Sequence, residues 1–125
     1  MPVQDLGPQK TTATDGTEGQ IRFTIPAGST LIHVSCRHNA SNAPNVPVRI
    51  SVMPSVPVAG GFNREFTRQL VPREFASSSG AFHKAVQWYG ALKFPEEREW
   101  AVLVSFVNNT GADLIMRAKA LVEVN

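Results

Sequence analysis

Apolar and polar residues alternate along most of the chain beyond residue 19. Ile21, Phe23 and Ile25 fall on one side of an extended segment over residues 20–25, with polar residues between them. Successive side chains of a β-strand point to opposite faces, so this pattern predicts a half-buried strand. The same alternation predicts further strands over residues 30–37, 48–53, 82–89, 100–107 and 114–124.

The last two predicted strands differ in whether one or both of their faces are apolar. Residues 100–107 are apolar on both faces, which predicts a central strand covered on both sides. Residues 114–124 are apolar on one face only. Because the turn-rich residues 108–113 join the two segments, we expect them to form a long terminal hairpin.

Turn-forming residues separate these strands. Residues 26–29 predict a tight turn, and residues 38–47 predict a loop because they are rich in Asn, Ser and Pro. Residues 54–62 predict an apolar loop, since two prolines remove donors from any strand ladder. Residues 64–75 fit neither period, and we expect a weak edge strand or a short helical turn.

The predicted fold class is all-β: a single antiparallel β-sandwich, jelly-roll-like, with an extended N-terminal arm. Residues 1–19 are polar without apolar periodicity and form the arm, either frayed or ordered on a neighbouring subunit. Residues 20–125 form the sandwich domain. The chain has 125 residues, with 9 Gly and 9 Pro, which suits one strand-rich domain better than a helical bundle.

Charge and cysteine content restrict the partners only a little. The net charge is +2, with residues 48–93 contributing +4 and residues 94–125 contributing −2. We therefore expect no specific nucleic-acid partner. No apolar run approaches the ~20 residues of a membrane span, so no membrane partner is expected, and no export signal is recognised at the N-terminus. A single cysteine forms no intramolecular disulfide, which favours synthesis in a reducing compartment.

Catalytic chemistry finds little support in these residues. His33 and His38 differ by an odd number, so a continuous strand directs them to opposite faces, and His83 has no partner in a His-x-His pair. Cys36 falls on an apolar face, where a free cysteine is usually inert. Residues 96–99 place acidic side chains in a turn, which is typical of a solvated rim. We expect no enzyme, no metal and no cofactor.

Aromatic residues offer a second class of function. Trp88, Tyr89 and Trp100 are candidate platforms for stacking on sugars, with Asn109 or Asp113 as acceptors of sugar hydroxyls. Both tryptophans fall on otherwise apolar faces, which favours core packing. A small carbohydrate-binding module is therefore the alternative function.

The candidate contact surface lies in the middle of the chain. An apolar loop either folds onto its own core or is buried against another subunit. Arginines pair specifically with carboxylates, and a solvated face is the other explanation for them. The candidate protein-interaction residues are Val56, Val58, Phe62, Arg64, Arg68 and Arg73.

Residues 23–29, Phe-Thr-Ile-Pro-Ala-Gly-Ser, resemble a strand-turn-strand motif of β-sandwich virion proteins of tailed bacteriophages. Residues 106–114 are similar to the final hairpin of such domains. Glycine-rich tips and repetitive shafts of trimeric fibres are absent from this sequence. The resemblance implies a structural virion protein, made in the host cytoplasm.

Within that class the resemblance favours a capsid decoration or cement protein, with a tail or baseplate component as the close variant. Its implied partners are copies of itself, as a homo-oligomer for which a trimer is favoured, and a major capsid or other virion protein.

Overall fold

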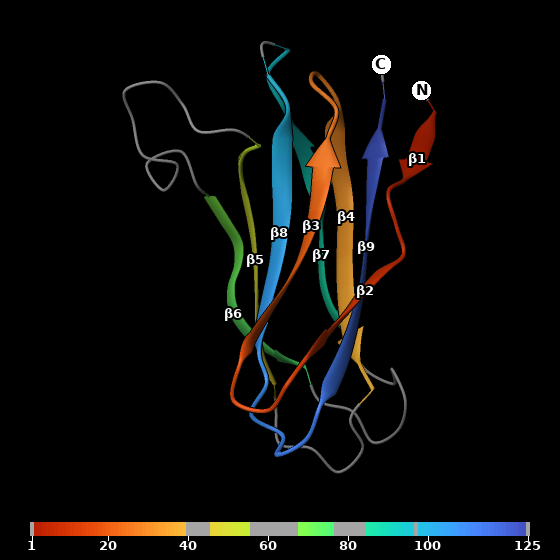
Figure 1. Ribbon diagram of the computed structural model, residues 1–125. Coiled ribbons are helices and arrows are strands. Elements are labelled where there is room, and N and C mark those ends of the chain that lie inside the picture. Colours follow the sequence, from red (N-terminus) through yellow and green to blue (C-terminus); the bar gives the residue numbers. More distant parts are fainter. Residues whose placement is uncertain (1, 40–45, 56–67, 77–84, 97, 125) are drawn as a thin grey trace.

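The computed structural model describes residues 2–39, 46–55, 68–76, 85–96 and 98–124, and of residues 73–76 it describes the backbone only. These residues form nine β-strands in two antiparallel sheets that pack face to face (Figure 1). Sheet A contains β1 (Val3–Asp5), β2 (Gln9–Ala13), β4 (Thr30–His38), β7 (Ala85–Lys93) and β9 (Leu114–Glu123). Sheet B contains β3 (Glu18–Ile25), β5 (Val46–Pro54), β6 (Arg68–Ala76) and β8 (Trp100–Val107).

The strand order is that of a jelly roll. Sheet A runs β1-β9-β4-β7, with β2 also paired to β9, and sheet B runs β3-β8-β5-β6. The chain pairs from its ends inward: β1 and β2 with β9, β3 with β8, β4 with β7, and β5 with β6. A long hairpin rolled into two sheets gives this arrangement, in which both chain ends lie at the same end of the sandwich (Figure 1).

Alternating apolar residues fill the space between the sheets, as the sequence predicts. In sheet B, β3 contributes Ile21, Phe23 and Ile25, while β8 contributes Val102, Val104 and Phe106; all of them are buried. In sheet A, β9 is buried at every second residue from Leu114 to Val122. The predicted central position of residues 100–107 is confirmed, because β8 lies between β3 and β5.

The predicted terminal hairpin is wrong, because β8 and β9 belong to opposite sheets. Residues 108–113 carry the chain across the sandwich, and the fully buried Asn108 holds this crossing. Its Nδ2 donates to the carbonyl oxygens of Ala13 and Ala112, both at 2.8 Å, and its Oδ1 accepts from the Thr110 amide at 3.1 Å. Turn-rich composition marks a change of direction without specifying which strands it joins.

The N-terminal residues also differ from the expected extended arm. Residues 3–5 and 9–13 form β1 and β2, which pair with β9 at the edge of sheet A. Backbone hydrogen bonds to an open sheet edge require no apolar periodicity, which explains why the composition of this segment gave no strand signal. The arm is thus ordered on its own domain.

Two strands depart from the predicted pattern in their interior. A register shift between Leu31 and His33 interrupts β4, so Leu31 and not Ile32 shares the buried face with Val34 and Cys36. Strand β7 continues to Lys93, beyond the break predicted at Gly90. A Cβ at Gly90 would lie 2.6 Å from the Trp88 ring, so this glycine makes room for the indole.

Residues 64–75 are expected as an edge strand or a helical turn, and residues 68–75 belong to β6, an edge strand of sheet B. Residues 64–67 lie outside the described residues. Within the part of the chain that the structure describes, no helix has the length and hydropathy that a membrane crossing needs.

Candidate binding surface on the outer face of sheet A

The outer face of sheet A, which points away from sheet B, collects basic side chains from three strands. In the strand register Lys10 of β2 lies opposite Arg117 of β9, and Arg117 lies opposite Arg37 of β4. Paired residues share a face of the sheet, so the three cations form one row across it. Lys119 lies two residues along β9, opposite Ser35.

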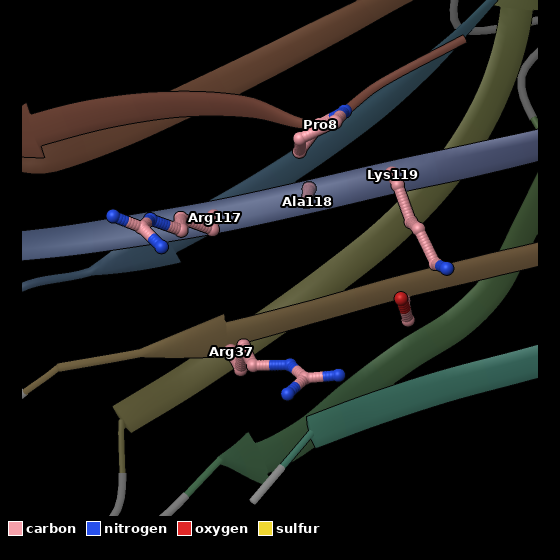
Figure 2. A pocket seen from close by; sticks show the side chains of 6 residues that line it. Pro8, Arg37, Arg117, Ala118 and Lys119 are labelled. Carbon is pink, nitrogen blue, oxygen red and sulfur yellow. The ribbon is translucent and has the colours of Figure 1, made fainter. Parts of the chain in front are cut away.

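Three of these cations, Arg37, Arg117 and Lys119, line a shallow hollow of about 220 Å³. It is lined by Pro8, Ser35, Arg37, Arg117, Ala118 and Lys119. Figure 2 shows the Lys119 side chain reaching from β9 toward β4, on the side where the Arg37 guanidinium lies, whereas Arg117 points along β9 away from both. We refer to Lys10, Arg37, Arg117 and Lys119 as the cationic cluster.

Two backbone features position the cluster. A Cβ at Gly7 would lie 2.9 Å from the Lys119 Cα, so glycine lets the chain between β1 and β2 pass closely over β9 and bring Pro8 to the hollow. In β4, residues after the register shift alternate so that His33, Ser35 and Arg37 point outward, opposite the buried Val34 and Cys36. The Ser35 residue is itself 5% exposed and forms part of the floor.

An aromatic pair lies on the same face. The rings of His33 and Tyr89 stack with centroids 4.4 Å apart and planes tilted by 19°. Gln87 Oε1 lies 3.2 Å from His33 Nε2 and accepts a hydrogen bond from the Tyr89 hydroxyl. Tyr89 is nevertheless 69% exposed, so the ring retains open surface. These contacts fix the orientation of an exposed aromatic platform.

The predicted contact residues are mostly not located by the structure. Val56, Val58, Phe62 and Arg64 lie outside the described residues. Arg68 is exposed at the start of the edge strand β6, and Arg73 lies in the same strand, where only its backbone is described. Their role in protein contacts stays a prediction.

The histidine and cysteine predictions are confirmed in position for the described residues. His33 is half-buried on the outer face, while His38 is fully buried on the inner face, opposite Met116. Cys36 is a buried free cysteine, and burial raises the pKa of its thiol to about 12. His83 lies outside the described residues.

The three candidate sugar platforms do not gather. Trp88 and Trp100 are half-buried and pack against the core, as expected, with the Trp100 ring 5.5 Å from that of Phe94. Tyr89 lies on the outer face of sheet A, and Asn109 and Asp113 are exposed in the connection between β8 and β9. Of the three predicted aromatic platforms, Tyr89 is therefore the one that is exposed.

Sequence reasoning missed the cationic cluster. Its four residues come from three segments separated by more than 20 residues each. The larger parts of the chain that hold them show no excess of positive charge, since residues 1–47 sum to 0 and residues 94–125 to −2. Outward positions on β4 and β9 are visible in the alternation, but their proximity depends on the pairing of β2, β9 and β4.

The jelly-roll fold relates the chain to known structures, while sequence comparison does not. No protein-family model and no curated protein matches the sequence. A chain from the structure of infectious bursal disease virus Gt strain superposes with a TM-score of 0.52 at 8% identity, covering 97% of this chain and 32% of the viral chain. This protein therefore spans about a third of that viral chain.

Weaker similarities extend to proteins of different kinds. A chain of the T13 infectious bursal disease virus particle gives a TM-score of 0.36 at 11% identity, covering 92% of this chain and 37% of that one. PliG of Aeromonas hydrophila, a periplasmic inhibitor of g-type lysozyme, gives 0.41 at 15% identity, covering 94% and 85%. Of these three chains, the one from infectious bursal disease virus Gt strain, with its TM-score of 0.52, supports a shared fold, and a fold by itself does not specify a function.

Proposed function

We propose that this chain is a structural virion protein of a tailed phage that decorates or cements the capsid shell by bridging neighbouring subunits. The observation that supports the proposal is the jelly-roll strand order, which extends over the whole described chain and is shared with a chain of a virus particle. The phage motif at residues 23–29 agrees with it, since these residues form the end of β3 and the turn before β4. On this proposal the protein resides in the virion, is made in the host cytoplasm and catalyses no reaction.

Described residues of the sandwich flank the proposed contact residues from Val56 to Arg64. Ser55, directly before Val56, donates its backbone amide to the Glu99 carbonyl at 3.1 Å, and its own carbonyl accepts from Arg22 Nη2 at 2.5 Å. Arg68, itself a proposed contact residue, begins the edge strand β6. In this proposal Val56, Val58 and Phe62 are buried against a partner, while Arg64, Arg68 and Arg73 pair with its carboxylates.

The partners in this proposal are further copies of the chain, as a trimer, and a major capsid protein or other virion protein. Many weak contacts on a lattice act together through their effective concentration, so each contact surface needs only modest affinity. Multi-angle light scattering of the isolated chain is expected to give the mass of a trimer.

The double substitution Val58→Asp with Phe62→Asp tests the contact loop. It is expected to leave the far-UV circular dichroism and the unfolding temperature unchanged and to abolish association with purified particles in co-sedimentation. Ala112→Asp, an exposed alanine in the connection between β8 and β9, introduces a carboxylate elsewhere and should sediment like the unmodified protein. Normal association of the double variant would show that the loop is not the adhesive surface.

Mass spectrometry of purified phage heads and tails tests the virion role itself. The chain is expected in heads at a fixed ratio to the major capsid protein. Its presence in tails alone would replace decoration by the tail or baseplate variant, and its absence from both fractions would overturn the proposal.

A further inference from the structure

We infer that the outer face of sheet A binds the phosphate backbone of single-stranded nucleic acid without reading its sequence. The inference rests on the juxtaposition of the cationic cluster with the Tyr89 platform, and it is independent of the virion role. From the sequence we expect no specific nucleic-acid partner. The inferred contacts are made to phosphates, which carry no sequence information, so the two statements are compatible.

The cationic cluster fits a chain of phosphates better than a single anion. Lys10, Arg117 and Arg37 lie on three adjacent strands, so the row spans two strand spacings, about 10 Å. Lys119 adds a second row roughly 7 Å along β9. Like charges placed directly opposite one another disfavour strand pairing, and a bound polyanion removes that repulsion.

The hollow supplies a seat for one phosphate group within this row. Arg37, Arg117 and Lys119 line it together with Ser35, whose hydroxyl can donate a hydrogen bond, and with Pro8. Lys119 extends toward the same side as the Arg37 guanidinium (Figure 2). Guanidinium groups bind phosphate oxygens in a bidentate manner, and an ammonium acts on the same oxygens as a point charge.

Tyr89 distinguishes nucleic acid from an acidic protein surface as the partner. Its ring is 69% exposed, and contacts with His33 and Gln87 hold it in place. It lies four residues along β7 from Ala85, which pairs with Arg37, a separation of roughly 13 Å along the strand. An unpaired base stacks on such a ring, whereas the carboxylates of an acidic peptide have no aromatic face to stack on it.

Among the described strand residues of sheet A, Asp5 and Glu123 are the acidic ones. Glu123 lies at the C-terminal end of β9, whereas Asp5 is opposite Leu121, two residues from Lys119. Asp5 Oδ1 accepts a hydrogen bond from the Gly7 amide at 2.9 Å, so this carboxylate is held near the Lys119 side of the cluster. The four cations of the cluster outnumber these two carboxylates, which leaves a positive surface for a nucleic-acid strand.

Fluorescence anisotropy of a 5′-labelled oligothymidylate of about 15 nucleotides, at low salt, tests the inference with the full chain. The double variant Arg37→Gln with Lys119→Gln is expected to bind about tenfold more weakly or worse, and its salt slope should fall by about 0.7 for each cation removed. Tyr89→Ala should weaken binding by about fivefold or more through loss of stacking. Lys10→Gln, at the exposed edge strand, gives a second charge variant with less risk to folding.

Arg98→Gln is the matched control, because Arg98 is exposed in the connection before β8 and outside the cluster. It should bind like the unmodified protein. No binding at low salt, or an equal loss in Arg98→Gln, would overturn the inference. Equal displacement by polyglutamate, together with an unaffected Tyr89→Ala variant, would assign the face to an acidic protein surface instead.

Discussion

The two sheets have similar inner faces and different outer faces. On sheet B two outward arginines bind backbone carbonyls of the same chain: Arg22 donates to the Ser55 carbonyl, and Arg49 Nε donates to the Pro72 carbonyl of the neighbouring strand β6 at 2.9 Å. On sheet A, Arg37, Arg117 and Lys119 line a hollow. The outer face of sheet B thus has arginines that fasten backbone segments to one another, and the outer face of sheet A has a cation-lined surface.

The largest effect is expected where the chain passes from sheet B to sheet A. Asn108→Asp removes both donors to the Ala13 and Ala112 carbonyls and places a carboxylate in a fully buried site. We expect the free energy of unfolding to fall by about 3 kcal/mol or more in urea titrations, with both sheets lost together.

Gln69→Glu makes the same amide-to-acid change at an exposed position of β6 and should cost less than about 0.5 kcal/mol. A similar loss in both variants would mean that the Asn108 crossing does not join the two sheets.

The inner face of sheet A should respond to alkaline pH through Cys36. Its thiol pKa is about 12 in the fold and 9.0 when unperturbed, because burial disfavours the thiolate. The unfolded chain thus loses this proton first as the pH rises, and stability present below about pH 9 declines toward pH 12. At pH 10 the loss is about 1 kcal/mol.

Cys36→Ala removes this contribution, so comparison of its pH profile with that of the unmodified protein isolates the thiol. Parallel profiles between pH 8 and pH 10 would show that the thiol is accessible to water and that the inner face is not closed around it.

The outer face of sheet B should depend on its arginine for stability. Arg22→Gln shortens the side chain and removes the hydrogen bond to the Ser55 carbonyl. This bond holds Ser55, which directly precedes the proposed contact residue Val56. We expect the free energy of unfolding, measured by thermal unfolding, to fall by about 1 kcal/mol. This figure already allows for solvent screening, because Arg22 is exposed. An unchanged unfolding temperature would remove the distinction between the two outer faces.

On the outer face of sheet A, removing a cation should raise the free energy of unfolding instead of lowering it, and this is the smallest of the expected effects. Lys119→Gln reduces positive charge beside Arg37 and Arg117. We expect a gain of a few tenths of a kcal/mol at low ionic strength, which disappears in high salt because exposed charges are screened over about 10 Å at 0.1 M. A clear destabilisation at low salt would assign Lys119 to the fold and not to a binding surface.

Much of the candidate surface could not be predicted from the sequence, because it depends on which strands pair. Alternation identified Arg37, Arg117 and Lys119 as outward residues, and it located Cys36 in the core. It gave no sign that Lys10, in a polar segment, completes the row, since an edge strand can be held by its backbone alone. The predicted loop residues, from Val56 to Arg64, were selected by composition and lie outside the described structure.

The sequence by itself determined six of the described strands, most of their buried positions and the all-β sandwich, because alternation of apolar and polar side chains is a local property of each strand. Only the tertiary structure decided that β8 and β9 separate into different sheets, that the N-terminal segment closes the edge of sheet A, and that β4 shifts its register at Leu31. Those features depend on hydrogen bonds between distant strands, and the gathering of four cations on one face follows from them.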